Sequence, residues 1–265
     1  SIFQDAPTLG SLIDPSAPEN RLDMATFQEL EPLLENALSN GEDIEKVERG
    51  VVADGIAKAA DLLSEKYQLI PTNEPYLKRG KQANFLQNWL SNNYPDASQD
   101  LATAFVDRCS QLCRSSGTQA TVTPLNWLLL VSYEDVRRRF LHSQTWNFVC
   151  SVGSGATATS SWDTLRGLVV ISDIDPNTEN RIGGVVTESA SEEERAWDIA
   201  NKSVTVTRQT QQIENPDSRI LLSEVGESSF LREYASGLQG ISPADLSHFG
   251  RGFWEIDPTG PEWSY

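Results

Sequence analysis

Cysteine is scarce in this sequence, and long apolar runs are absent. Its 265 residues hold three cysteines, too few, and an odd number, for a secreted scaffold held together by disulfides. The longest apolar run, Trp127 to Val131, has five residues, whereas a membrane span needs roughly 18. The first 20 residues contain no lysine or arginine and predict no secretory leader. We therefore expect a cytoplasmic protein, or one inside an assembled particle.

Basic residues are also few. Lysine and arginine total 21 against 38 acidic residues, which gives a net charge of −17. Because such a charge repels polyanions, the sequence predicts no direct nucleic-acid partner. The charge is uneven, however, with −9 over residues 1–66, +2 over 67–150 and −10 over 151–265. An electropositive contact surface is therefore expected in the middle third.

Residues with evident catalytic chemistry are rare. Histidine, the usual acid–base group near neutral pH, occurs twice. The sequence has no G-x-S-x-G, H-E-x-x-H or G-x-x-x-x-G-K-[ST] motif. It therefore predicts no catalytic residue, no metal ligand and no cofactor.

Proline and glycine divide the chain. Three prolines and one glycine within the first 22 residues predict an extended N-terminal arm over residues 1–23. Amphipathic spacing then predicts a helical domain over 24–145. Its five helices are expected over 31–39, 43–68, 81–91, 98–115 and 124–142.

The composition changes after residue 145. Glycine, serine and threonine become frequent, and alternating β-branched residues predict a mixed α/β region over 146–249. Its expected elements are strands over 168–172, 182–187, 204–207 and 220–225 and helices over 192–202 and 229–238. An extended aromatic tail over 250–265 carries Trp254 and Trp263, which need a surface to bury against. The predicted fold class is α+β, an N-terminal bundle of about five helices followed by this mixed region, with extended termini.

Three patterns suggest ligand sites. Residues Gly153–Asp173 contain G-x-G-x-x-A and, twenty residues after the first glycine, an acidic residue, as in dinucleotide-binding folds. The following Thr- and Ser-rich stretch forms helices poorly, which favours a connector instead. The segment that begins at Asp173 resembles a calcium loop but lacks its glycine and final glutamate, so a turn is the simpler interpretation. Cys109 and Cys113 could supply half of a metal site, although core packing explains them better.

Arginines form the densest basic cluster. Arg137, Arg138 and Arg139 lie near a predicted helix end, and Lys78, Arg79 and Lys81 form a second cluster. Cations near a helix C-terminus are stabilising without any ligand. Three consecutive arginines also reach several neighbours, and arginine is enriched at interfaces. We therefore take Arg137, Arg138, Arg139, Trp254 and Trp263 as candidate interface residues.

These features favour a non-enzymatic assembly protein, a connector or adaptor of a larger particle such as a virion. Its predicted partners are copies of itself and other subunits, with no membrane contact. The alternative is a nucleotide- or metal-dependent enzyme that uses the Gly153–Asp173 segment. A third hypothesis, an acidic module that mimics nucleic acid, has the charge but lacks a dense carboxylate stripe.

Overall fold

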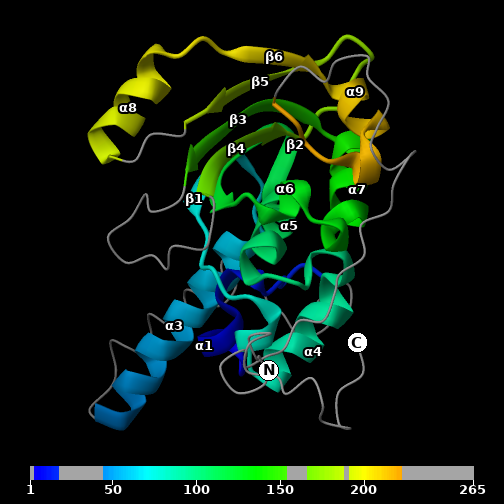
Figure 1. Ribbon diagram of the computed structural model, residues 1–265. Helices are drawn as coiled ribbons and strands as arrows, with labels where there is room; N and C mark the ends of the chain where they lie inside the picture. The colour runs from blue at the N-terminus through cyan, green and yellow to red at the C-terminus, as the bar shows by residue number, and fades with distance from the viewer. Residues whose placement is uncertain (1–2, 18–43, 154–165, 188–190, 223–265) are drawn as a thin grey trace, which may run out of the picture. The chain divides into compact units, whose positions relative to one another are not determined.

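A computed structural model of the protein describes residues 3–17, 44–153, 166–187 and 191–222 (Figure 1). The chain divides into two units, residues 1–224 and 225–265, and every described residue lies in the first. None of the described helices combines the length and the apolar character needed to cross a bilayer.

A six-stranded mixed sheet is the centre of the described structure. Its strands are β1 (Tyr67–Asn73), β2 (Cys113–Pro124), β3 (Thr145–Gly153), β4 (Arg166–Ser172), β5 (Arg181–Val186) and β6 (Thr205–Arg208). Their order is β1-β2-β4-β3-β5-β6. The pairs β1–β2 and β3–β5 are parallel, whereas β4 and β6 are antiparallel to the strands they pair with. Four strands therefore run one way and two the other.

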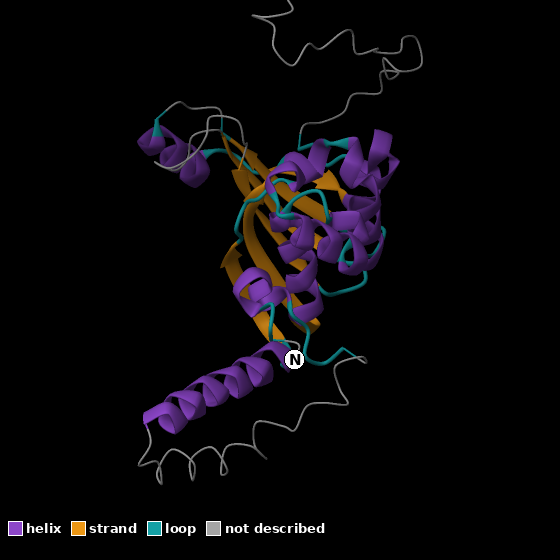
Figure 2. Cartoon of the chain, turned by 90° about the horizontal axis from the view of Figure 1, so that it is seen from below, coloured by secondary structure: helices purple, strands orange, loops and turns teal. Residues whose placement is uncertain are grey.

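Helices link these strands and gather mainly on one face of the sheet (Figures 1 and 2). The α-helices are α1 (Ala6–Leu9), α3 (Ile44–Ser64), α4 (Asn84–Asn93), α5 (Leu101–Leu112), α6 (Asn126–Leu129), α7 (Glu134–Ser143), α8 (Glu192–Asn201) and α9 (Gln209–Glu214). Short 3-10 turns are η1 (Gly10–Leu12), η3 (Arg79–Lys81), η4 (Pro95–Ala97), η5 (Val131–Tyr133) and η6 (Pro216–Ser218). Because α4 and α5 join β1 to its parallel neighbour β2, this part of the chain is a β-α-β crossover.

Local sequence explains where several helices begin. The Asp100 side chain accepts a hydrogen bond from the Ala102 backbone and caps α5. Ser191 accepts one from Glu194 at 3.1 Å and caps α8. Such caps satisfy backbone N–H groups that the first helical turn leaves unpaired.

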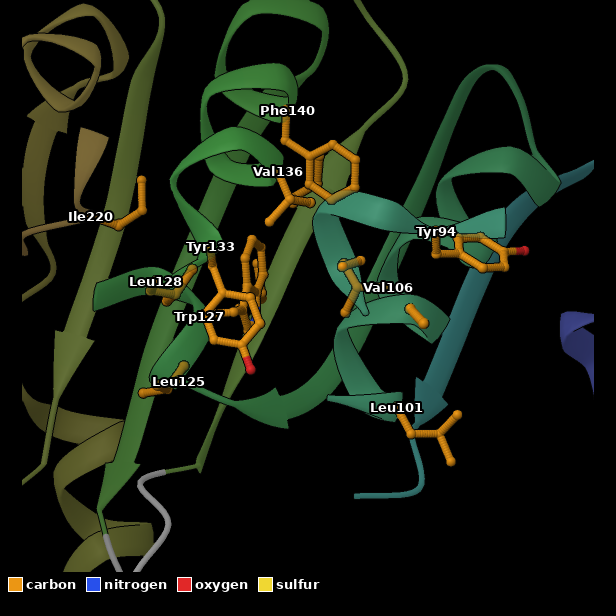
Figure 3. Close-up of a cluster of buried hydrophobic side chains, with 14 of the residues drawn as sticks. Tyr94, Leu101, Val106, Leu125, Trp127, Leu128, Tyr133, Val136, Phe140 and Ile220 are labelled. Carbon is orange, nitrogen blue, oxygen red and sulfur yellow. The ribbon is translucent and has the colours of Figure 1, made fainter. Parts of the chain in front are cut away.

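The core lies between the sheet and the covering helices. Trp127 of α6, Phe140 of α7 and Trp146 of β3 are each at most 1% exposed. The Trp127 ring meets Phe140 edge-on at 6.2 Å and Trp146 at 5.6 Å between centroids. Figure 3 shows Phe140 and Val136 facing the same cluster. This single cluster contains residues on both sides of position 145, so helical and strand-rich parts share one core.

Arg108 of α5 holds the N-terminal segment against the body. Its side chain is buried and donates to the carbonyl oxygens of Ser11, Ile13 and Leu63 at 2.9–3.1 Å, while Asp14 lies 3.4 Å away as an ion pair. The expectation of an extended arm is therefore wrong for residues 3–17, which form helical turns and contribute buried residues to the core. The rest of that arm lies outside the described residues.

The predicted N-terminal helical bundle is wrong. β1 and β2 lie within the range expected to be helical, and the helices pack on a sheet rather than on one another alone. The helix expected over 124–142 is divided into α6, η5 and α7, because Leu130 has an extended conformation. Residues 220–222 form no strand. The predicted helices over 31–39 and 229–238 and the tail over 250–265 lie outside the described residues.

Candidate active site at the carboxyl edge of the sheet

One edge of the sheet collects the carboxyl ends of β1, β2, β3 and β5, because these four strands run the same way. We call it the carboxyl edge. The first residue of β4, Arg166, lies there between Pro124 of β2 and Gly153 of β3. Ligands of sheets with parallel strands bind outside the carboxyl ends of those strands. A ligand site is therefore expected at this edge.

The chain leaves β1 at this edge through the sequence Asn73-Glu74-Pro75-Tyr76. The Tyr76 hydroxyl lies 3.1 Å from the Asn73 Oδ1 and 3.2 Å from the carbonyl oxygen of Val122, so it has an acceptor on its own turn and one on β2. Pro75 fixes its own φ between them. An exposed carboxamide and an aromatic ring are thus held together by a short, constrained turn.

Arg166 covers one face of the Tyr76 ring. Its guanidinium carbon lies 5.0 Å from the ring centroid, within the range of a cation–π contact. The next residue, Gly167, is required by packing, since a Cβ there would lie 2.1 Å from the Cys150 carbonyl oxygen and 2.8 Å from Leu125. Burial raises the pKa of Tyr76, and the nearby Arg166 charge opposes that rise. The ring is therefore a neutral phenol near pH 7, with a cation beside it.

Glu74 is the unusual group of the site. It is 4% exposed, and its carboxyl group has no partner among the described residues beyond its own backbone N–H. Burial raises the pKa of Glu74 to about 8, because the charged form loses its hydration. Buried unpartnered polar groups are rare and cluster at functional sites. Glu74 thus places a buried, neutral carboxylic acid within the Asn73–Tyr76 turn.

Sequence reasoning missed Asn73, Glu74 and Tyr76. An available signal was the Asn-x-Pro-Tyr turn, which begins three residues after the short apolar pair Leu69-Ile70. The helix predicted over 43–68 instead covers the first two residues of β1. Without β1 as a strand, nothing in the sequence indicates that this turn lies at a sheet edge.

The predicted interface arginines lie on α7. Arg137 is 0% exposed and donates to the carbonyl oxygens of Trp127, Leu130, Asp217 and Ser218 at 2.6–3.2 Å. It has no surface to offer a partner, because it ties α6 and η6 to α7.

The other two arginines are partly exposed and paired. Arg138 contacts Glu134 at 2.6 Å, and Arg139 contacts Asp107 at 2.7 Å and Asp96 at 3.6 Å. An interface role for Arg138 and Arg139 stays a prediction. Trp254 and Trp263 lie outside the described residues.

The segment Gly153–Asp173 is no dinucleotide fold. It leaves β3 and returns as β4, and these strands pair antiparallel, whereas that fold needs parallel strands joined through a helix. Residues 154–165 lie outside the described residues. The resemblance to a calcium loop has a simpler explanation, since Asn177 Oδ1 accepts from the Glu179 backbone within a turn. Within the described ranges, no group of acidic, cysteine or histidine side chains could hold a metal ion.

The cysteines are buried thiols. Cys109 and Cys113 are 6% and 7% exposed, and burial raises the pKa of Cys109 to about 12 and that of Cys113 to about 11. Both thiols are therefore protonated near pH 7 and poor nucleophiles. Cys109 belongs to α5, whereas Cys113 begins β2, so they do not share one helix face.

Two proteins named as adenine-specific methyltransferases are similar in sequence to part of this chain. Adenine-specific methyltransferase BrxX of Escherichia coli (strain HS) is 26% identical over 166 residues, which cover 63% of this chain and 13% of the relative. Adenine-specific methyltransferase PglX of Lacticaseibacillus casei (strain Zhang) is 27% identical over 115 residues, which cover 43% and 9%. The chain thus spans about a tenth of the length of these curated relatives.

The chain is less similar to solved structures, both in fold and in sequence identity. A chain of a type I restriction-modification system has a TM-score of 0.45 and 14% identity, over 79% of this chain and 55% of that one. A type I restriction-modification methyltransferase subunit from Streptococcus thermophilus has a TM-score of 0.42 and 10% identity, over 58% and 37%.

The family comparison overturns the assembly hypothesis. The family described as Eco57I restriction-modification methylase matches residues 15–156, and both relatives above carry the name of an enzyme. A structural protein or virion component is therefore wrong, and so is a non-enzyme. The expected lack of nucleic-acid contact also fails, because restriction-modification methylases act on DNA. Since the match covers more than half of its residues, the chain belongs to the Eco57I restriction-modification methylase family.

Proposed function

We propose that this chain forms the target-base side of an adenine-specific DNA methyltransferase. The observation that carries the proposal is the Asn73–Tyr76 turn at the carboxyl edge, which lies within the residues matched by the family. The names of BrxX and PglX favour adenine as the target base. A cytoplasmic location fits this proposal, because the DNA of a bacterial cell lies there.

The geometry suits a base that has left the DNA stack. Methyltransferases extrude the target nucleotide, stack it on aromatic side chains and bind its edge through hydrogen bonds. Tyr76 supplies a ring that is braced through its hydroxyl. A carboxamide such as that of Asn73 can accept from the adenine amino group and donate to a ring nitrogen.

Asn73 would orient the amino group for methylation. Methylation would leave a positive charge on the amino nitrogen, and the nitrogen would lose that charge by releasing one proton to solvent. An amide oxygen that accepts a hydrogen bond from this nitrogen holds it in one direction and stabilises the positive charge that develops on it. An amide does not keep the proton, so we assign Asn73 to binding and orientation.

The reaction also needs a methyl donor, and the turn from β1 to α4 does not fit one. In the turn from β1 to α4 the only glycine is Gly80, whose Cα faces open space, whereas a backbone cradle for a nucleoside group needs a close approach that a Cβ would block. We therefore assign no donor-binding residue and derive no step through the donor.

The test is DNA methylation in cells. The protein is expressed in cells that lack adenine methylation, and N6-methyladenine is mapped by sequencing that detects modified bases. Asn73→Ala should lower methylation by about 100-fold, the usual cost of removing one orienting hydrogen-bond group. Tyr76→Phe keeps the ring and should cost only about 2- to 10-fold, the value of one hydrogen bond.

Asn177→Ala is the matched control, because it removes an exposed carboxamide from the turn after β4, at the opposite edge of the sheet. It should methylate like the unchanged protein. Thermal unfolding shows that each variant is folded. Methylation by folded Asn73→Ala at the unchanged level would contradict the proposal.

A further inference from the structure

The turn that follows Tyr76 carries an unusual concentration of positive charge. Lys78, Arg79 and Lys81 lie within four residues, between β1 and α4, in a chain of net charge −17. Lys78 and Lys81 are exposed and Arg79 is partly exposed. We call residues 78–81 the basic turn.

The basic turn is not neutralised by ion pairs. None of its three cations lies within ion-pair distance of a carboxylate in the part of the chain that the structure describes. Several other cations do pair with nearby acids, namely Arg138, Arg139, Lys202, Arg208 and Arg219. The charges of Lys78 and Lys81 therefore face solvent, and Lys78 also opposes the rise that burial causes in the pKa of Asp100.

Side chains beneath the turn hold it in one conformation. Buried Gln82 donates to the carbonyl oxygen of Leu77 at 2.9 Å, and Gln87 of α4 donates to those of Arg79 and Gln82 at 3.0 and 2.9 Å. The Arg79 backbone N–H donates to the Gln99 carbonyl at 2.9 Å. A loop that only spans two elements needs no such bracing, whereas rigidly placed loops commonly carry binding residues.

The basic turn lies within reach of anything stacked on Tyr76. Lys78 follows Tyr76 by two residues, so their Cα atoms are at most about 8 Å apart. Successive phosphates along a DNA strand are spaced by about 3.4 Å of helix axis. A nucleotide on the Tyr76 ring would thus bring its own and neighbouring phosphates near the cations of the turn.

We infer that the basic turn binds the DNA phosphates that flank the target nucleotide. This inference rests on the proposed function, since it assigns the DNA strand to the same edge of the sheet. Lys78 and Lys81 act as mobile point charges, and Arg79, fixed by its 2.9 Å bond to Ser91, sets the position of the strand. Phosphate contacts position DNA without reading its sequence.

The test measures binding without methylation. Fluorescence anisotropy follows the affinity of the protein for a labelled DNA duplex of mixed sequence, between about 50 and 200 mM salt, with no methyl donor added. Each lost phosphate contact reduces the slope of log affinity against log salt by about 0.9. The triple variant Lys78→Gln, Arg79→Gln, Lys81→Gln should therefore lose about 2.7 from that slope.

A second triple variant, Lys58→Gln, Arg114→Gln, Arg181→Gln, is the matched control. It removes the same charge from exposed positions on α3 and at the starts of β2 and β5, away from the carboxyl edge. Its slope should stay unchanged. If the first triple variant fails to fold, the double variant Lys78→Gln, Lys81→Gln leaves the Arg79–Ser91 bond intact and should lose about 1.8.

Equal slopes for the two triple variants would overturn the inference, even where Asn73→Ala abolishes methylation and the proposed function stands. A selective loss of slope supports the inference, even where no methylated adenine is found and the proposed function fails. The two results therefore separate the DNA surface from the chemistry.

Discussion

Arg137 and Glu74 are both buried ionisable side chains, but their surroundings are opposite. The Arg137 guanidinium meets four carbonyl oxygens. Burial lowers the pKa of Arg137 only to about 10, so it stays charged. The Glu74 carboxyl group has no comparable partner among the described residues, and burial raises its pKa to about 8. One group is buried as an ion with four hydrogen bonds from its five N–H groups, and the other is buried as a neutral acid.

This difference distinguishes a residue that stabilises the fold, Arg137, from one that belongs to the candidate site, Glu74. A buried charge with complete hydrogen bonds fixes its neighbours in one arrangement. The α7 region thus stabilises the fold. A buried acid without partners costs stability and remains where function requires it. Glu74 lowers stability at the carboxyl edge, next to Asn73 and Tyr76, the residues that we assign to binding the target base.

The largest expected effect is the loss of the Arg137 bonds. Arg137→Met removes the bonds to four carbonyl oxygens, of which that of Leu130 still accepts from the Tyr133 N–H, and should lower the free energy of unfolding by about 4 kcal/mol. Arg137→Lys keeps the charge but not the planar fork and should recover less than half of that loss. Urea denaturation measures both. A loss below about 1 kcal/mol for the methionine variant would mean that the Arg137 bonds do not hold α6 and η6 to α7.

Substitution of Glu74 should change the free energy of unfolding in the opposite direction and stabilise the protein. In the unfolded chain its carboxyl group ionises near its ordinary pKa of 4.5, whereas in the folded protein it stays neutral to about pH 8. Unfolding therefore releases a proton between these values, and stability falls as pH rises through this window. Glu74→Gln, which resembles the neutral acid and does not titrate, should raise the free energy of unfolding at pH 7 by about 3 kcal/mol.

The pH series supplies the control for Glu74. Near pH 4 the acid is neutral in both states, so the variant and the unchanged protein should unfold at nearly the same urea concentration. A gain that is equal at all pH values would mean that the glutamine improves packing and that titration is not the cause. Methylation by the variant, measured separately, shows whether the neutral acid also serves the site.

The sequence predicts correctly those helices and strands that have a local signal, such as a helix cap or a run of β-branched residues. The helix over 192–202 was recognisable because Ser191 and Glu194 form a cap. The strands over 168–172 and 182–187 were recognisable from β-branched runs, and the structure has β4 and β5 there. These elements carry their own signals, and packing did not override them.

The site depends on contacts that the sequence does not show. β2 turns Gln119, Thr121 and Thr123 inward, so it lacks the apolar alternation by which strands are recognised. β1 lies at the sheet border and has mostly exposed or half-buried residues. Without these strands, Asn73 and Arg166 have no common edge. The residues of the basic turn are recognisable in the sequence as a basic cluster, but the net charge of −17 argued against nucleic acid as the partner, because a sum over the chain does not describe a local surface.

The smallest effect is expected for Arg138, and it tests whether the stabilisation of α7 is specific to Arg137. Arg138 is the next residue on α7, but its side chain is 54% exposed and, among the described residues, forms its ion pair with Glu134, one turn away. Exposed pairs of this kind are worth about 0.5 kcal/mol or less, so Arg138→Met should change the free energy of unfolding by no more than that. Urea denaturation alongside Arg137→Met gives the comparison directly. If the two variants lost equal stability, arginine as such on α7 would stabilise the fold, and the four carbonyl bonds would not explain why Arg137 is buried.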